Sequence, residues 1–138
     1  MKIHLQHNDY EALALFRYAM RKFLRFSKTT LGAEAALTPE QYEALLALKA
    51  FGNSTGSLNI GELSERLQVK HHTAVSLAGK LVVRKLVARK PSARDRRQVR
   101  LKLTAAGDSL LARMAAIHRQ EMRIRSVEMI DALVRLQE

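Results

Sequence analysis

The side chains in this 138-residue chain that are best placed to do chemistry are basic. Eleven of the 24 lysines and arginines lie between Lys70 and Lys102, where Asp95 is the only acidic residue. The formal net charge is +11, so nearly all of the excess positive charge sits in this quarter of the chain. Such a local excess repels itself unless an anionic partner is expected. Nucleic acid is the leading candidate for that partner, and an anionic membrane surface is the second.

The first half of this basic segment predicts a helix, from about His71 to Lys85, that could enter the major groove of DNA with its first turn nearest the base edges. Polar side chains can form hydrogen bonds to bases there, while cations suit phosphates, which fix position without carrying sequence information. The candidates for base contact are His71, His72, Thr73 and Ser76, and the candidates for phosphate contact are Lys70, Lys80, Arg84 and Lys85. The alternative is an ordinary helix start on a solvated face.

A second group of cations lies on a predicted hairpin turn. Arg94, Arg96 and Arg97 are close enough in sequence for their guanidinium groups to reach together into a narrow minor groove. Asp95 among them is predicted to orient a neighbouring arginine through a charge-assisted hydrogen bond. A merely solvated charged loop is the competing interpretation.

The sequence gives little support for catalysis, disulfide formation or metal binding. The absence of cysteine excludes disulfides, Cys-ligated metals and thiol nucleophiles, and the common hydrolase, zinc-protease and phosphate-loop motifs are missing. Adjacent His71 and His72 have the wrong spacing for a helical metal pair. We interpret His4 and His7 as residues near a mobile end and His118 as a residue on the outer side of a helix, with a zinc or copper site across a dimer as the alternative. The sequence therefore predicts no catalytic residue, no metal and no cofactor.

A membrane role is also disfavoured. No apolar run approaches the roughly 18 to 20 residues that span a bilayer, and the segment from Met1 to Asp9 is too polar for a secretory signal. The basic segment is split between a helix and a hairpin and lacks the Trp or Phe face of an interfacial helix. We therefore expect a cytoplasmic protein with no membrane partner.

The elements that must position these residues are mostly helical. A stripe of apolar residues predicts a first helix from about Asn8 to Lys28. The capping sequence Thr38-Pro39-Glu40-Gln41 predicts the start of a second helix, which should run to Phe51 before a loop over residues 52–57. A capping box then opens a short helix at Asn59, and a brief connection joins it to the basic helix, which makes a unit of helix-turn-helix size.

The period of the apolar residues changes after the basic helix. Val99–Leu103 alternates strictly, as a half-buried strand does, and Leu86–Lys90 can pair with it as a hairpin. Thr104 can cap a last helical region. The sequence leaves open whether this region is one bent helix or two helices split near Ser126.

The resulting order is helix, helix, helix-turn-helix, basic hairpin and long helix. Five passages carry a more specific pattern: Leu37-Thr38-Pro39-Glu40-Gln41-Tyr42, Asn59-Ile60-Gly61-Glu62-Leu63-Ser64-Glu65-Arg66-Leu67, His71-His72-Thr73-Ala74-Val75, Asp95-Arg96-Arg97 and Leu103-Thr104-Ala105-Ala106-Gly107. In this order and spacing the chain resembles the MarR (multiple antibiotic resistance regulator) transcription factors. Two residues depart from the family pattern: Lys85 stands where glycine is usual, and Gly79 where an acidic residue is common.

The resemblance implies a mainly α (α+β) fold, a winged helix-turn-helix with dimerisation helices at both ends. In a single domain of residues 1–138, residues of about 37–103 would bind DNA, and about 1–36 and 104–138 would form the dimerisation helices. It also implies a homodimer on double-stranded DNA that regulates transcription, most often as a repressor, in the cytoplasm of a bacterium or archaeon, with Arg97 in the minor groove. A pocket for a small-molecule effector could be lined by Phe16, Met20 and Tyr42. The alternative is an architectural DNA-binding protein with little sequence preference.

Overall fold

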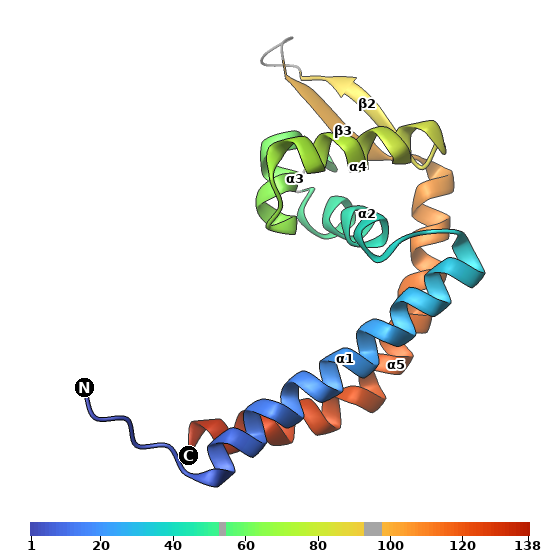
Figure 1. The fold of residues 1–138 in the computed structure, drawn as a ribbon. Helices are drawn as coiled ribbons and strands as arrows, with labels where there is room; N and C mark the ends of the chain where they lie inside the picture. The colour runs from blue at the N-terminus through green and yellow to red at the C-terminus, as the bar shows by residue number, and fades with distance from the viewer. Residues whose placement is uncertain (53–54, 93–97) are drawn as a thin grey trace.

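The computed structural model describes residues 1–52, 55–92 and 98–138. Its helices are α1 (His7–Ala35), α2 (Pro39–Phe51), α3 (Ile60–Leu67), α4 (His71–Val83) and α5 (Ala105–Gln137), and its strands are β1 (Ser57–Asn59), β2 (Val87–Pro91) and β3 (Val99–Leu103). The elements from α2 to β3 form one lobe, and α1 runs beside the distal part of α5 as an arm that leads to both termini (Figure 1). We call these two parts the winged-helix lobe and the arm.

Helices α2 and α3 begin where the sequence predicts. Thr38 Oγ1 accepts a hydrogen bond from the Gln41 N–H at 3.1 Å, and Gln41 Oε1 accepts one from the Thr38 N–H at 3.0 Å. The same reciprocal pair joins Asn59 and Glu62, at 2.7 and 3.0 Å. Each cap satisfies backbone donors that the helix itself cannot, and a single cap is worth about 1 kcal/mol. The starts of α2 and α3 are therefore fixed by residues within four positions of each other.

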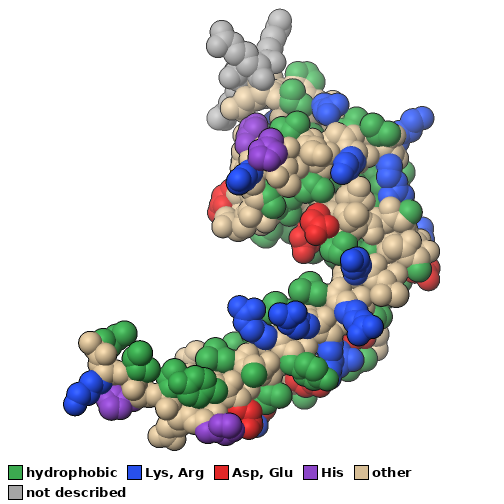
Figure 2. Space-filling model, in the orientation of Figure 1, with side chains coloured by type: hydrophobic (Ala, Val, Ile, Leu, Met, Phe, Trp, Pro, Cys, Tyr) green, Lys and Arg blue, Asp and Glu red, His purple; other side chains and the backbone are tan. Residues whose placement is uncertain are grey.

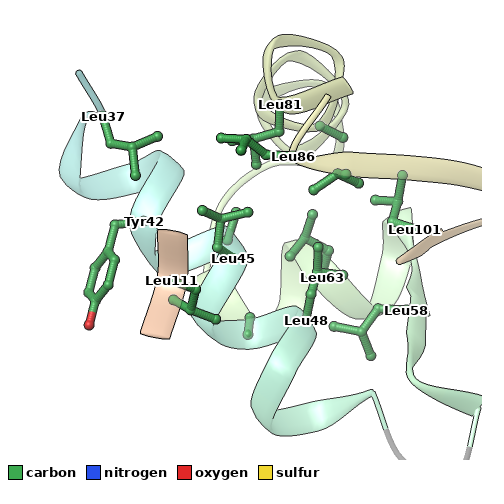
Figure 3. Packing of buried hydrophobic residues seen from close by; sticks show 14 of the residues in the cluster. Leu37, Tyr42, Leu45, Leu48, Leu58, Leu63, Leu81, Leu86, Leu101 and Leu111 are labelled. Atoms are coloured by element: carbon green, nitrogen blue, oxygen red, sulfur yellow. The ribbon is translucent and has the colours of Figure 1, made fainter. Parts of the chain in front are cut away.

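The core of the winged-helix lobe draws leucines from α2, α3, α4, β1 and β3. Leu45 of α2, Leu63 of α3, Leu81 of α4 and Leu101 of β3 are each no more than 1% exposed, and Figure 3 shows such side chains converging. Burial of one such side chain contributes roughly 1.5–3 kcal/mol. This packing holds one face of α4 against the lobe and leaves the opposite face outward.

The sheet contains a strand that the sequence does not predict. Ser57 was expected to end a loop, but it begins β1, which pairs antiparallel with β3 with Ser57 opposite Lys102. The sheet order is β1-β3-β2, and the predicted hairpin has Val87 opposite Leu103. A strand of three residues is too short to show an alternating pattern, so β1 is defined by its partner.

Two predicted helix ends are wrong. The first helix continues to Ala35 instead of ending near Lys28, because Leu31 and Ala35 are buried and extend its packed face by two turns. α4 ends at Val83, two residues before Lys85. The last helical region, which the sequence leaves as one bent helix or two, is one continuous helix, α5. Thr104 Oγ1 caps it by accepting a hydrogen bond from the Gly107 N–H at 3.0 Å.

The arm is an antiparallel pair of helices. The carboxyl-terminal end of α5 lies beside the amino-terminal end of α1, where Arg135 Nη1 is 2.9 Å from Glu11 Oε1. Further along, Lys22 Nζ is 3.8 Å from Glu128 Oε1. These pairs are largely exposed, and exposed pairs contribute only about 0–1 kcal/mol each, so the register of the arm depends mainly on packing.

The turn after α4 contains a strained residue. Lys85 has φ 61°, in the left-handed region, where a residue with a Cβ costs roughly 1–2 kcal/mol. We expect Lys85→Gly to raise the free energy of unfolding by about 1 kcal/mol, as measured by urea denaturation followed by circular dichroism. Lys80→Gly, inside α4, is the matched control and should lower it by about 1 kcal/mol. A lower free energy of unfolding in both variants would contradict this explanation.

Candidate nucleic-acid interface

The outward face of α4 presents most of the polar residues that the sequence singles out. His71, His72, Ser76 and Lys80 are exposed, and Thr73 is half-buried. The opposite face of the helix is packed, with Ala74, Leu77, Ala78 and Leu81 buried. The two histidine side chains of the winged-helix lobe lie together on its surface (Figure 2). Within the described part of the chain, none of the five polar side chains has a hydrogen bond or ion pair, so all are available to a ligand.

The partial positive charge at the first turn of α4 is also not neutralised by a capping or acidic side chain of the helix. Lys70 is its N-cap residue, no side chain caps the helix, and its first turn contains no acidic residue. The free N–H groups of a helix start carry about half a positive charge, which favours an anion such as a phosphate group. The backbone of α4 therefore adds to the attraction that exposed Lys70 and Lys80 exert on a polyanion.

The structure gives Arg84 a protein partner. Its Nη1 donates to the carbonyl of Ala36 at 2.8 Å and its Nη2 to the carbonyl of Ala35 at 2.9 Å, both at the end of α1. The sequence predicts a phosphate contact for this side chain, as it does for Lys70, Lys80 and Lys85. All four side chains are exposed, but Arg84 is also held by these two hydrogen bonds.

The hairpin contributes cations of two kinds. Arg89, Lys90 and Lys102 are exposed. Arg100 instead donates to Ser57 Oγ and to the Ser57 carbonyl, both at 2.8 Å, and lies 3.3 Å from Glu62, so it joins β3 to β1 and α3. The predicted tip residues Arg94, Asp95, Arg96 and Arg97 lie outside the described residues, and their role stays a prediction from the sequence.

His118 corrects a prediction. We expected it on the outer side of a helix, but it is 5% exposed. Its Nε2 lies 2.9 Å from Ser27 Oγ, and its Nδ1 lies 2.7 Å from the Met114 carbonyl, to which it must donate. The Tyr42 ring stacks on it with centroids 4.5 Å apart. The signal was in the sequence, since Met114 and His118 are spaced four residues apart on the buried stripe of α5.

A cavity of about 470 Å³ opens beside His118, between α1, α2 and α5. Its lining includes Tyr42, one of the three predicted effector residues, together with Phe23 and Arg119. Phe16 and Met20, the other two predicted effector residues, are half-buried on α1 and are not among the residues that line it. The structure therefore does not bring the three together at this cavity.

Burial changes two ionisable groups at this cavity. It raises the pKa of the Tyr42 hydroxyl, and it raises the pKa of the Glu43 carboxyl, to which neighbouring Glu40 adds a smaller effect in the same direction. Both effects follow from the cost of placing a charge where water is partly excluded.

Residues 1–52, 55–92 and 98–138 offer neither a cluster of metal ligands nor a membrane-spanning helix. No group of three or more His, Cys, Asp or Glu side chains there could hold a metal ion. No helix formed by these residues is both long enough and apolar enough to cross a bilayer.

The sequence of the winged-helix lobe has known relatives. The sequence model of the MarR family matches residues 37–98. The HTH-type transcriptional repressor MdtR of Bacillus subtilis (strain 168) is 38% identical over 72 residues, which cover 52% of this chain and 44% of that relative. The matched segment thus spans less than half the length of the curated relative.

The whole fold has relatives among solved structures. AbsC, a MarR family transcriptional regulator from Streptomyces coelicolor, has a TM-score of 0.76 at 18% identity, over 93% of this chain and 84% of that one. BpsR of Bordetella bronchiseptica, whose DNA binding is regulated by 6-hydroxynicotinic acid, has a TM-score of 0.70 at 22% identity, over 99% and 96%. These two likenesses show a shared winged-helix fold. The sequence match to the MarR family model is confined to residues 37–98, whereas the likeness in fold extends over nearly the whole chain.

Proposed function

We propose that this chain is a sequence-specific double-stranded-DNA-binding regulator of transcription that acts as a repressor. The observation that carries the proposal is the start of α4, where the first two turns leave His71, His72 and Ser76 exposed and without partners in the described chain, beside uncompensated N–H groups. A major groove matches both features, because it offers base edges to the side chains and phosphates to the helix start. The related MdtR is a transcriptional repressor.

The experiment is a selection of bound sites from genomic DNA, followed by titrations against the best site and a scrambled duplex. We expect Ser76→Ala to weaken binding to the best site by about 1–3 kcal/mol and to relax the preference for the bases it faces. Lys80→Ala should weaken both duplexes about equally. An architectural protein with little sequence preference would bind both duplexes alike before and after Ser76→Ala. That result would contradict our proposal and favour the architectural role.

The proposal includes a homodimer, with residues 1–36 and 104–138 as the dimerisation region and 37–103 as the DNA-binding region. Large apolar side chains stay exposed along the arm, as the green atoms of Figure 2 illustrate. Those at least 45% exposed are Tyr10, Leu13, Tyr18, Leu24, Ile124, Val127, Ile130, Leu133 and Val134. Monomeric proteins rarely expose so extended an apolar surface. A second copy would cover this face and set two α4 helices on one pseudopalindromic site.

Val127→Asp is expected to raise the dimer dissociation constant roughly 100-fold, because a carboxylate buried in an apolar interface has no partner. Val127 is 69% exposed in the single chain, so its replacement should leave the fold of the protomer intact. Sedimentation at micromolar concentration measures the change. Val83→Asp is the matched control, since Val83 is 81% exposed but lies on α4, outside the arm. A parent that sediments as a stable monomer would contradict the dimer.

Release by a small molecule is the last part of the proposal. The cavity beside His118 has about 470 Å³, within the range of roughly 300–1,000 Å³ that small-molecule sites occupy. It lies where the arm meets the winged-helix lobe, so a ligand there would contact α1, α2 and α5 together. BpsR, which has this fold, is regulated by a small molecule.

A further inference from the structure

Both helices of the arm meet α4 at one short turn, residues 84–86. On one side, Thr104 holds the start of α5 to this turn: its Oγ1 donates to the Lys85 carbonyl at 2.7 Å and its N–H to the Leu86 carbonyl at 3.1 Å. The Leu86 N–H in turn closes α4 by donating to the Leu81 carbonyl at 3.0 Å. The end of α4 is therefore fixed to the start of α5 by backbone and hydroxyl groups.

On the other side, Arg84 holds the end of α1. That helix ends at Ala35, its C-cap residue Ala36 has φ 51°, and the Leu37 N–H returns to the Leu31 carbonyl at 3.1 Å. The carbonyls of Ala35 and Ala36 accept the two Arg84 hydrogen bonds, at 2.9 and 2.8 Å. The last carbonyls of a helix lack partners and attract a cation, yet α1 has no basic residue in its own last turn. Arg84 supplies that cation from the end of α4.

We propose that Arg84 is a positioning residue, which ties the end of α4 to the end of α1 and so sets how the first turn of α4 meets DNA. The inference rests on the proposed DNA binding and refines it. A helix of 13 residues with one face packed moves as a rigid body, so its fixed end determines where His71, His72 and Ser76 point. Arg84 then acts on base recognition without touching DNA, and its charge neutralises no phosphate.

Two substitutions separate this role from a phosphate contact. Arg84→Lys keeps the charge but cannot make two parallel hydrogen bonds to adjacent carbonyls, whereas Arg84→Met removes both the charge and the donors. Lys85→Met is the matched control, because it removes a charge from the same turn and leaves the contact with α1 intact. The probes are the tightest duplex that the parent selects from random-sequence DNA and a scrambled duplex of the same length, each titrated at several salt concentrations.

Positioning predicts that Arg84→Lys and Arg84→Met both lose about 3- to 30-fold in affinity for the selected duplex, with little change for the scrambled one and an unchanged salt slope. A phosphate contact predicts that Arg84→Lys binds like the parent and that Arg84→Met weakens both duplexes and lowers the slope by about 1. The second pattern would overturn the inference, as would an Arg84→Met variant that binds both duplexes like the parent.

Amide hydrogen exchange without DNA gives an independent readout on the intact protein. Loss of the link should speed exchange at Leu37 and Leu86, whose N–H groups close α1 and α4, in both Arg84 variants and not in Lys85→Met. Unchanged exchange at both positions would overturn the inference even if affinity fell. If the parent selected no duplex, the proposed function would fail, while the exchange data would still decide whether Arg84 couples the two helices.

Discussion

Gly107→Ala is expected to lower the free energy of unfolding by at least about 4 kcal/mol, which is in the range of the most damaging single substitutions. Gly107 is buried in the first turn of α5. A Cβ there would overlap the Leu86 carbonyl oxygen and lie 2.9 Å from its carbon and 3.2 Å from the Leu86 Cα. All three atoms belong to the backbone of the turn after α4, which Thr104 already holds. Neither backbone can retreat without breaking these hydrogen bonds.

The matched control for this prediction is Gly32→Ala in α1. A Cβ on Gly32 would meet nothing within 4 Å, so the substitution should gain the usual helix advantage of alanine, about 0.5–1 kcal/mol. Urea denaturation of both variants measures the difference, with sedimentation to keep the oligomeric state equal. If Gly107→Ala were as stable as the parent, the close approach of α5 to the turn would be wrong.

DNA affinity is expected to fall by about 10³- to 10⁵-fold between 50 and 200 mM salt, if a dimer makes roughly 6 to 10 phosphate contacts. Each contact releases condensed counterions, and the number released sets the slope. The structure narrows which cations can contribute, because Arg84 and Arg100 donate to protein acceptors. The exposed cations of the described segment that lack a protein partner are Lys70, Lys80, Lys85, Arg89, Lys90 and Lys102.

Titrations over a salt series test this prediction with the parent and with single alanine variants. Lys80→Ala should reduce the slope by about 1, since it removes one exposed cation from the outward face of α4. Arg100→Ala should leave the slope nearly unchanged, although it removes the same charge. A nearly flat salt response of the parent would show that this basic segment is not the binding surface.

Features set by nearby residues could be predicted from the sequence. The capping residues at Thr38 and Asn59 each depend on neighbours within a few positions, and both caps are confirmed. The antiparallel pairing of β2 with β3 is confirmed too, because a short connection leaves few other pairings. The order of the predicted elements agrees with the fold that the family resemblance implies, and the structure confirms that order.

Contacts between distant residues could not be predicted in this way. Arg84 reaches carbonyls 48 and 49 residues away, and Arg100 reaches Ser57 across 43 residues. In the sequence both arginines look like the other members of a basic run. Only the folded backbone brings an unpaired helix end or a serine within reach of one of them. For the same reason, only the folded structure distinguishes the basic residues of the candidate site that are free from those that are bonded to other parts of the protein.

The antiparallel arm pairs two helices that are translated at different times. α1 leaves the ribosome before the winged-helix lobe and α5 leaves after it, yet the two helices pack against each other along the arm (Figure 1). The winged-helix lobe between them is translated up to Leu103 before α5, although Leu111 and Met114 of α5 complete its core cluster. During that interval α1 has no partner for its apolar face. The nascent chain therefore carries an unprotected helix until α5 has been made.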